Sequence, residues 1–189
     1  MSQVTILSGE TETVVDLKDP YLAAFLAWLI PGAGHLYQGR TTKGLLFMIC
    51  ILGTFFYGLI LGDGKVVYAS LRPGDVRLPY VCQVGAGLPA LPAMVEAYRA
   101  KNNKPPLFGG MMVPPKLAQN NEGVDELGQW HRYLNRNFEL GTVYTMIAGL
   151  LNILVIYDAW GGPMQYGEEK KKPDPDKSND KKPEPPPGS

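Results

Sequence analysis

The sequence predicts an all-α protein embedded in a membrane, and two observations carry this prediction. Three runs of eighteen to twenty residues contain no charged side chain, at 20–39, 44–62 and 140–157. A helix of about 20 apolar residues is as long as the hydrocarbon core of a bilayer is thick. The mean hydropathy of −0.09 resembles that of a soluble protein only because these runs are averaged with polar ends. We therefore expect three transmembrane helices, a fourth that the residues leave open, and one amphipathic juxtamembrane helix.

Charge and composition divide the 189 residues into three parts. Residues 1–19 form a polar, acidic segment with a net charge of −3, and residues 20–161 form the helical membrane domain, with +3. Residues 162–189 form a tail with six basic residues, six acidic residues and seven of the seventeen prolines. Because the tail has almost no apolar side chain to offset the entropy lost on ordering, we expect it to be disordered. The whole chain has no net charge, which gives no case for nucleic-acid binding.

The three transmembrane helices are expected at about 20–38, 44–62 and 139–160. Pro20 suits the first turn of the first helix, but Pro31-Gly32 should kink or break that helix, since proline removes a backbone hydrogen bond. The second run is apolar on every side, which is typical of a helix in lipid. Tyr157 and Trp160 end the third helix, and such amphipathic aromatic side chains favour the headgroup level.

The sequence leaves open whether residues 79–97 cross the membrane. Residues 78–95 are uncharged, and Arg77 and Arg99 flank the segment as they would flank a transmembrane helix. Pro89 and Pro92, with the glycines before them, disfavour an isolated helix, although prolines are tolerated in membranes when neighbours satisfy the freed carbonyls. The segment therefore either crosses the membrane, re-enters it, or lies against the other helices.

An amphipathic helix is expected just before the last transmembrane helix. Its apolar residues recur at spacings of three and four, and Asn121 is the expected N-cap. These residues are Val124, Leu127, Trp130 or His131, Leu134 and Phe138. A helix of this kind leading straight into a transmembrane helix would lie at the membrane interface.

The most specific motif lies between the first two runs and predicts a tight turn with glycines that allow close helix approach. The residues of this turn motif are Pro31, Gly32, Gly34, His35, Tyr37, Gly39, Arg40 and Gly44. The pattern Pro-Gly-x-Gly-x-x-Tyr-x-Gly resembles a family of uncharacterised small bacterial multi-pass membrane proteins, and these resemble the two-transmembrane-helix hairpin domain. The Asp158-Ala159-Trp160 ending is similar to that of their last helix. This chain has His35-Leu36-Tyr37 where the hairpin domain has an Asp-Arg-Phe or His-Arg-Phe triplet. The resemblance implies a bacterial inner-membrane protein and no established activity.

Four further residues are candidates for helix packing: Gly58, Gly62, Asn152 and Asp158. Gly58 and Gly62 have the spacing of a small-residue helix contact. Asn152 lies within an apolar run, so we expect it to donate a hydrogen bond to another helix. Asp158 could pair with Arg40 or His35, but a solvated carboxylate at the end of the run is the preferred interpretation.

His35 could be a metal ligand or a proton-transfer group, since an ionisable residue at a membrane helix end favours a functional role. The preferred interpretation is a turn histidine bonded to a carbonyl group or to lipid, because the only other histidine, His131, lies in a remote segment. Replacing His35 is then expected to cost less stability than replacing Gly34. Cys50 and Cys82 have no metal-ligand spacing and are interpreted as small apolar residues.

No catalytic, cofactor or metal motif is recognised, so we expect neither an enzyme nor a bound cofactor. The leading hypothesis is a structural or interaction subunit that contacts the lipid bilayer and either a membrane-protein partner or copies of itself. The alternative is a small transporter or channel component that uses the helices broken by proline and glycine, since interrupted helices often form binding sites in transporters.

Overall fold

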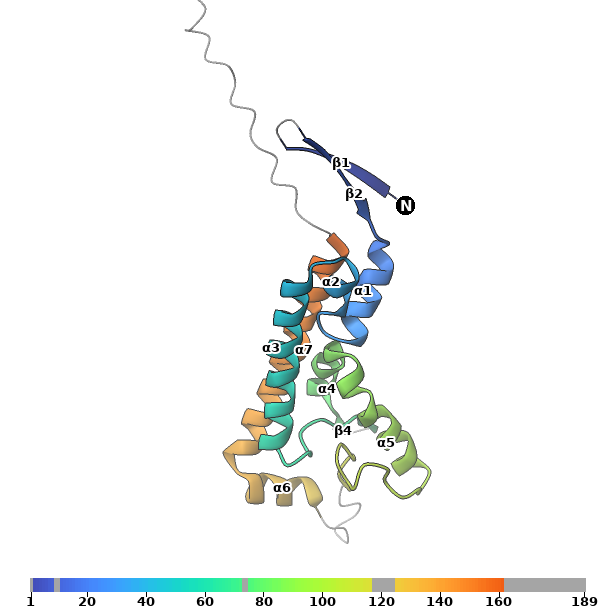
Figure 1. Cartoon of the computed structure of the whole chain (residues 1–189). Helices are drawn as coiled ribbons and strands as arrows, with labels where there is room; N and C mark the ends of the chain where they lie inside the picture. The colour runs from blue at the N-terminus through green and yellow to red at the C-terminus, as the bar shows by residue number, and fades with distance from the viewer. Residues whose placement is uncertain (1, 9–10, 73–74, 117–124, 162–189) are drawn as a thin grey trace, which may run out of the picture.

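Two long antiparallel helices form the centre of the protein. The computed structural model describes residues 2–8, 11–72, 75–116 and 125–161. Helices α3 (Thr41–Leu61) and α7 (Arg136–Gly161) lie side by side, with α3 running from the upper to the lower end in Figure 1 and α7 running back. Within the described residues, these are the two helices long and apolar enough to cross a membrane.

The predicted first transmembrane helix is instead a helical hairpin. Asp19 caps α1 (Pro20–Leu29), and the chain reverses at Pro31-Gly32, where Gly32 has a φ of 85°, before α2 (Ala33–Tyr37). The predicted break is therefore confirmed. Lys18 Nζ donates to the Tyr37 carbonyl oxygen over 2.7 Å, so both ends of this first hairpin lie at the upper end of the molecule (Figure 1). The expected single crossing helix at 20–38 is thus not shown.

The segment at 79–97 is also a folded-back hairpin. It consists of α4 (Leu78–Gln83), η1 (Val84–Ala86), η2 (Leu88–Ala90) and α5 (Pro92–Lys101). The reversal is at Gly87, whose φ is 75°, and the Tyr80 hydroxyl donates to the Ala90 carbonyl over 2.9 Å between the two arms. Both ends of this second hairpin lie toward the lower end (Figure 1), so it does not run across as one helix.

Short strands accompany the helices. Strands β1 (Ser2–Ser8) and β2 (Thr11–Leu17) form an antiparallel hairpin before α1, in the segment predicted only as polar and acidic. Strands β3 (Leu71–Arg72) and β4 (Asp75–Val76) pair in the connection after α3. The prediction of helices is confirmed for the described residues between 20 and 161, apart from β3 and β4, whereas the β1-β2 hairpin was not predicted from the sequence.

The predicted amphipathic helix is confirmed as α6 (Glu126–Leu134). The Asp125 side chain accepts a hydrogen bond from the Gly128 N–H over 3.0 Å and caps it. Leu127, Trp130 and Leu134 pack against the core. The expected N-cap Asn121 and Val124 lie outside the described residues, as does the tail at 162–189.

Both long helices expose large apolar side chains on their outer faces. On α7, Gly149, Asn152 and Ala159 are buried, whereas Leu154 is 66 % exposed. On α3, Phe55 is buried, but Ile60 is 77 % and Ile49 63 % exposed. A soluble monomer rarely exposes a contiguous apolar surface of this extent.

Candidate functional site

His35 is buried between three helices at the upper end. It lies on α2, which packs closely against α1 because Gly34 has no side chain; a Cβ there would collide with the Ala23 carbonyl oxygen. The imidazole has no exposed surface and contacts the Phe47 ring edge-on, with ring centroids 5.1 Å apart. The first hairpin thereby directs His35 toward the end of α7.

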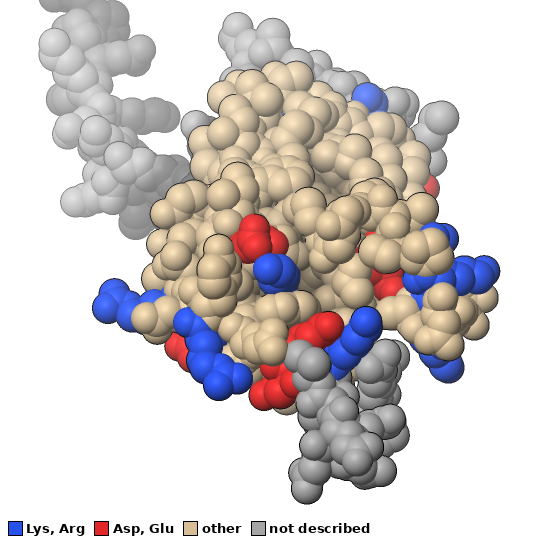
Figure 2. Space-filling model, turned by 90° about the horizontal axis from the view of Figure 1, so that it is seen from below, with Lys and Arg blue, Asp and Glu red and all other residues tan. Residues whose placement is uncertain are grey.

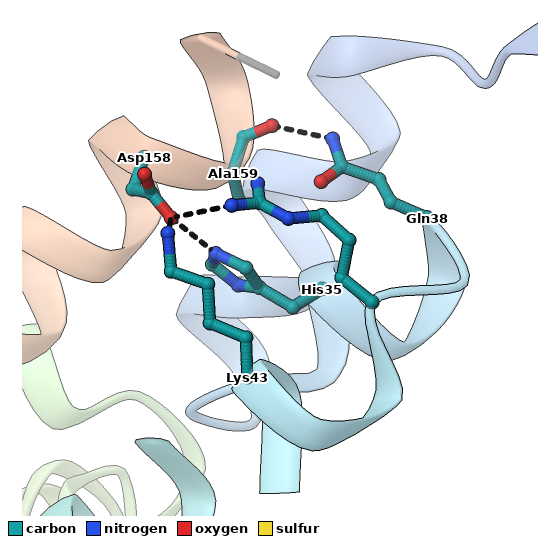
Figure 3. Close-up of polar contacts among 6 residues, drawn as sticks. His35, Gln38, Lys43, Asp158 and Ala159 are labelled. Carbon is teal, nitrogen blue, oxygen red and sulfur yellow. Dashed lines mark hydrogen bonds and ion pairs between the residues drawn. The ribbon is translucent and has the colours of Figure 1, made fainter. Parts of the chain in front are cut away.

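Asp158 joins this histidine to two basic residues. Its Oδ2 atom lies 2.6 Å from His35 Nε2, 2.6 Å from Lys43 Nζ and 3.7 Å from Arg40 Nη2 (Figure 3). Gln38 adds a hydrogen bond from Nε2 to the Ala159 carbonyl oxygen over 2.6 Å. We call His35, Arg40, Lys43 and Asp158 the ion cluster. It connects α2 and the start of α3 to the last turn of α7.

The preferred interpretations of His35 and Asp158 were therefore wrong. A crossing helix would have placed His35 at the headgroups, but the hairpin returns to α7 and turns the imidazole inward. Asp158 keeps 33 % side-chain exposure and is ion-paired, so it is not a solvated boundary carboxylate.

The geometry favours a neutral imidazole. His35 Nδ1 is buried and has no hydrogen-bond partner among the described residues. A neutral ring can donate its Nε2–H to Asp158 and leave Nδ1 as an acceptor, whereas an imidazolium would bury a second N–H donor with no acceptor. The positive charge opposite Asp158 then comes from Lys43 and Arg40, so the ion cluster has a net charge of +1.

Asn152 joins the tips of both hairpins. Its fully buried side chain donates from Nδ2 to the Ala27 carbonyl oxygen, at 3.1 Å, and to the Gly85 carbonyl oxygen, at 2.9 Å. The tips also contact each other, since Trp28 Nε1 donates to the Val84 carbonyl oxygen over 3.3 Å. We call these contacts the tip junction. Asn152 Oδ1 has no partner among the described residues.

A second polar contact lies further down α7. Gln83 Nε2 donates to Thr145 Oγ1 over 2.8 Å and to the Val66 carbonyl oxygen over 3.2 Å. Arg77 Nη2 lies 3.3 Å from Thr142 Oγ1. The contacts of Gln83 and Arg77 were not predicted from the sequence. A signal was present, however, because Thr142, Thr145 and Asn152 follow one another at spacings of three and seven on an otherwise apolar helix, which indicates a single polar face.

The comparisons with known proteins identify a family. A model described as a family of unknown function, DUF6677, matches residues 22–172. The chain belongs to this family. No curated protein and no solved structure matches the chain. In this DUF6677 protein, the match includes both hairpins, both long helices, the tip junction and the ion cluster.

The other motif residues of the DUF6677 chain have different surroundings. A Cβ at Gly32 would collide with the Gly44 carbonyl oxygen, so the hairpin turn packs directly on α3. Pro31 is buried. Tyr37 lies under Lys18, whose Nζ is 4.9 Å from the ring centroid. Gly39 has a φ of 81° and open space around it.

Gly58 and Gly62 have different neighbours. A Cβ at Gly58 would lie 2.8 Å from the Gly141 carbonyl oxygen, so this glycine lies at the contact of α3 with α7. A Cβ at Gly62 would collide with Val66 on the same connection. Among the described residues, no group of three or more His, Cys, Asp or Glu side chains could hold a metal ion.

Proposed function

We propose that the chain is an integral membrane protein in which α3 and α7 cross the bilayer and the two hairpins enter it from opposite faces. The observation that supports this is the outward apolar surface of both long helices, which only lipid or other apolar chains would cover. The length of α1 is consistent with a hairpin that enters the bilayer and turns back, because its ten residues span about 15 Å, half the thickness of the bilayer core. Backbone that is not helical at such depth must be covered by protein, and the tip junction supplies that cover.

Cysteine labelling distinguishes this topology from four crossing helices. Cys50 and Cys82 are first replaced by Ala, and single cysteines are then introduced at Thr41, Lys65 and Gly161. With two crossing helices, an impermeant thiol reagent labels Thr41→Cys and Gly161→Cys from one side and Lys65→Cys from the other. With four crossing helices, Lys65→Cys and Gly161→Cys share a side and Thr41→Cys is opposite.

Within the membrane, we propose a structural or interaction role. The support is that the internal polar groups bind the protein itself: both Asn152 donors go to hairpin carbonyl groups, and Asp158 is bound by three side chains. Such a protein forms a rigid unit for assembly with a membrane-protein partner or with copies of itself. The inner membrane of a bacterium and the similarity to the two-transmembrane-helix hairpin domain are part of this proposal, and they rest on the turn motif.

A transporter or channel component is the second candidate. It is favoured by the two broken helices that meet at the tip junction, beside the unpaired Asn152 Oδ1 atom. Proteoliposomes separate the two candidates. A structural unit leaves the vesicles as impermeable to protons and potassium ions as empty vesicles and is recovered as a defined complex after cross-linking in membranes. A flux that disappears in Asn152→Leu, while Thr54→Ala retains it, would establish the second candidate instead.

A further inference from the structure

The loop at residues 102–116 exposes apolar side chains although it is firmly held. Leu107 is 56 % exposed, Phe108 48 % and Met111 44 %. The loop follows α5 at the lower end of the molecule, and Figure 2 shows this end from below, with Lys and Arg side chains interspersed with Asp and Glu side chains. A surface loop with three large exposed apolar side chains needs a physical explanation.

The buried Glu96 carboxyl group fixes the apolar tip of this loop. Glu96 is only 1 % exposed, and its Oε1 atom accepts hydrogen bonds from the N–H groups of Leu107, at 2.8 Å, and Phe108, at 3.1 Å. Both hydrogen bonds go to main-chain groups, so the two apolar side chains are left to project outward. A buried acidic side chain is rare without such partners.

Two further contacts hold the ends of the loop. Arg99 donates from Nε and Nη2 to the Pro105 carbonyl oxygen, at 2.9 Å and 2.6 Å. The Met112 N–H donates to the Gly64 carbonyl oxygen over 2.8 Å, which ties the loop to the connection after α3. The exposed side chains are thus presented by a backbone that is already fixed, so binding a partner does not require the backbone to be ordered.

Charge identifies the kind of partner. From residue 97 to residue 116 the chain has four basic residues and no acidic one: Arg99, Lys101, Lys104 and Lys116. Lys101, Lys104 and Lys116 are exposed. Aromatic and aliphatic side chains beside exposed lysines match the boundary between acyl chains and anionic headgroups. The apolar surface also continues onto α5, where Met94 is 54 % and Tyr98 65 % exposed.

We propose that residues 102–116 form an interfacial anchor that docks on anionic lipid in the leaflet at the lower end. Leu107, Phe108 and Met111 lie at the boundary of headgroups and acyl chains, and Lys101 and Lys104 bind lipid phosphates. Glu96 is a positioning residue that aims the tip. This proposal rests on the proposed membrane integration, because the leaflet is that of the membrane that α3 and α7 cross.

Fluorescence quenching by brominated lipids tests the anchor in the full chain. Trp28, Trp130 and Trp160 are replaced by Phe, and a single tryptophan is introduced as Phe108→Trp or, as a reference, as Ile60→Trp on α3. The proteins are reconstituted in phosphatidylcholine vesicles with about 30 % phosphatidylglycerol, enough anionic lipid to attract lysines. Lipids brominated near the headgroup should quench Phe108→Trp more than lipids brominated deep in the chain.

The reference separates the two proposals. Unquenched Ile60→Trp contradicts membrane integration itself. Quenched Ile60→Trp together with unquenched Phe108→Trp contradicts only the anchor and assigns the loop to water or to a protein partner.

Two further variants test the residues assigned to the anchor. Lys101→Gln with Lys104→Gln, or vesicles without phosphatidylglycerol, should lower Phe108→Trp quenching by about half, because either change removes the attraction between the lysines and the anionic headgroups. Glu96→Ala should reduce the quenching, whereas Glu96→Gln, which keeps an acceptor oxygen, should restore it. Equal quenching in Glu96→Ala and in the parent protein overturns the positioning role of Glu96. If the quenching is the same without the two lysines and without phosphatidylglycerol, the choice of anionic lipid is overturned.

Discussion

His35 Nε2 and Asp158 Oδ2 lie 2.6 Å apart although 123 residues separate them in the sequence. This hydrogen bond connects the first hairpin to the end of the last helix. It can form only because the chain reverses at Pro31-Gly32 and returns α2 to the upper end. The ion cluster is therefore a product of the hairpin geometry.

The first prediction concerns the coupling between these two residues. His35→Ala and Asp158→Ala should each destabilise the protein, and the double variant should lose less than the sum, with a coupling of about 1 kcal/mol because Asp158 is partly exposed. Thermal and denaturant unfolding in detergent measure all three variants. Additive losses would contradict a direct interaction and would return His35 to the role of a turn residue.

The second prediction concerns Gly34 and His35 together. The sequence alone predicts a smaller loss of stability for His35→Ala than for Gly34→Val, but both residues are buried. Gly34→Val should be strongly destabilising, since its side chain would collide with α1. His35→Ala should also lower the yield of folded protein in detergent, and a fully tolerated His35→Ala is the outcome that contradicts the buried position.

A third prediction addresses the tip junction through Asn152. Asn152→Leu keeps the branched shape of the side chain but removes both N–H donors, so the Ala27 and Gly85 carbonyl groups lose a partner. The loss of stability should be about 1–3 kcal/mol. Thr54→Ala is the matched control, because Thr54 is polar, lies on the long apolar helix α3 and, among the described residues, donates to Cys50 of its own helix. Similar unfolding temperatures for the two variants would argue against the junction.

The close approach of the hairpin tips gives a fourth prediction. Gly87 and Gly39 both have positive φ angles, 75° and 81°. A Cβ at Gly87 would collide with the Trp28 carbonyl oxygen, whereas a Cβ at Gly39 would meet nothing within 4 Å. Gly39→Ala should therefore show only the backbone strain, about 1 kcal/mol, and Gly87→Ala considerably more. Unfolding of both variants in detergent isolates the contribution of the tip contact.

A fifth prediction uses two glycines of α3. A Cβ at Gly58 would lie 2.8 Å from the Gly141 carbonyl oxygen, whereas Gly53 faces open space. Gly53→Ala should be neutral or slightly stabilising, by up to about 1 kcal/mol, because alanine favours helix more than glycine. Gly58→Ala should be destabilising, because it separates α3 from α7. If the two substitutions have the same effect on the unfolding temperature, the glycine contact is not part of the helix interface.

Hydrophobicity and turn residues predicted where the helices lie in the sequence, but not whether the chain continues straight or reverses between them. The uncharged runs located α3, α7 and the broken segments, and Pro31-Gly32 predicted the break. They could not show that the chain reverses there, because a kinked crossing helix and a folded-back hairpin contain the same residues. The reversal depends on contacts with distant residues, such as the hydrogen bond from Lys18 to Tyr37.

The same reason limited the prediction of the site. His35, Arg40 and Asp158 were recognised as candidates, and pairing among them was considered. Their burial depends on the hairpin, so it could not be inferred from sequence positions. Gln83 and Glu96 lie in the segment at 79–97, whose path the sequence leaves open, and only their hydrogen-bond partners give them a structural role.

The tip junction also fixes the order in which this molecule can be completed during synthesis. Both hairpins and α3 leave the ribosome before Asn152, which supplies the donors for the Ala27 and Gly85 carbonyl groups. Until α7 has been made, these carbonyl groups at the hairpin tips lack their hydrogen-bond donor, Asn152. Neither hairpin contains a single helix that is long enough to cross a membrane. Before α7 is made, the nascent chain therefore has one helix long and apolar enough to cross a membrane, α3, and the contacts that join the two hairpins form only when the last helix is complete.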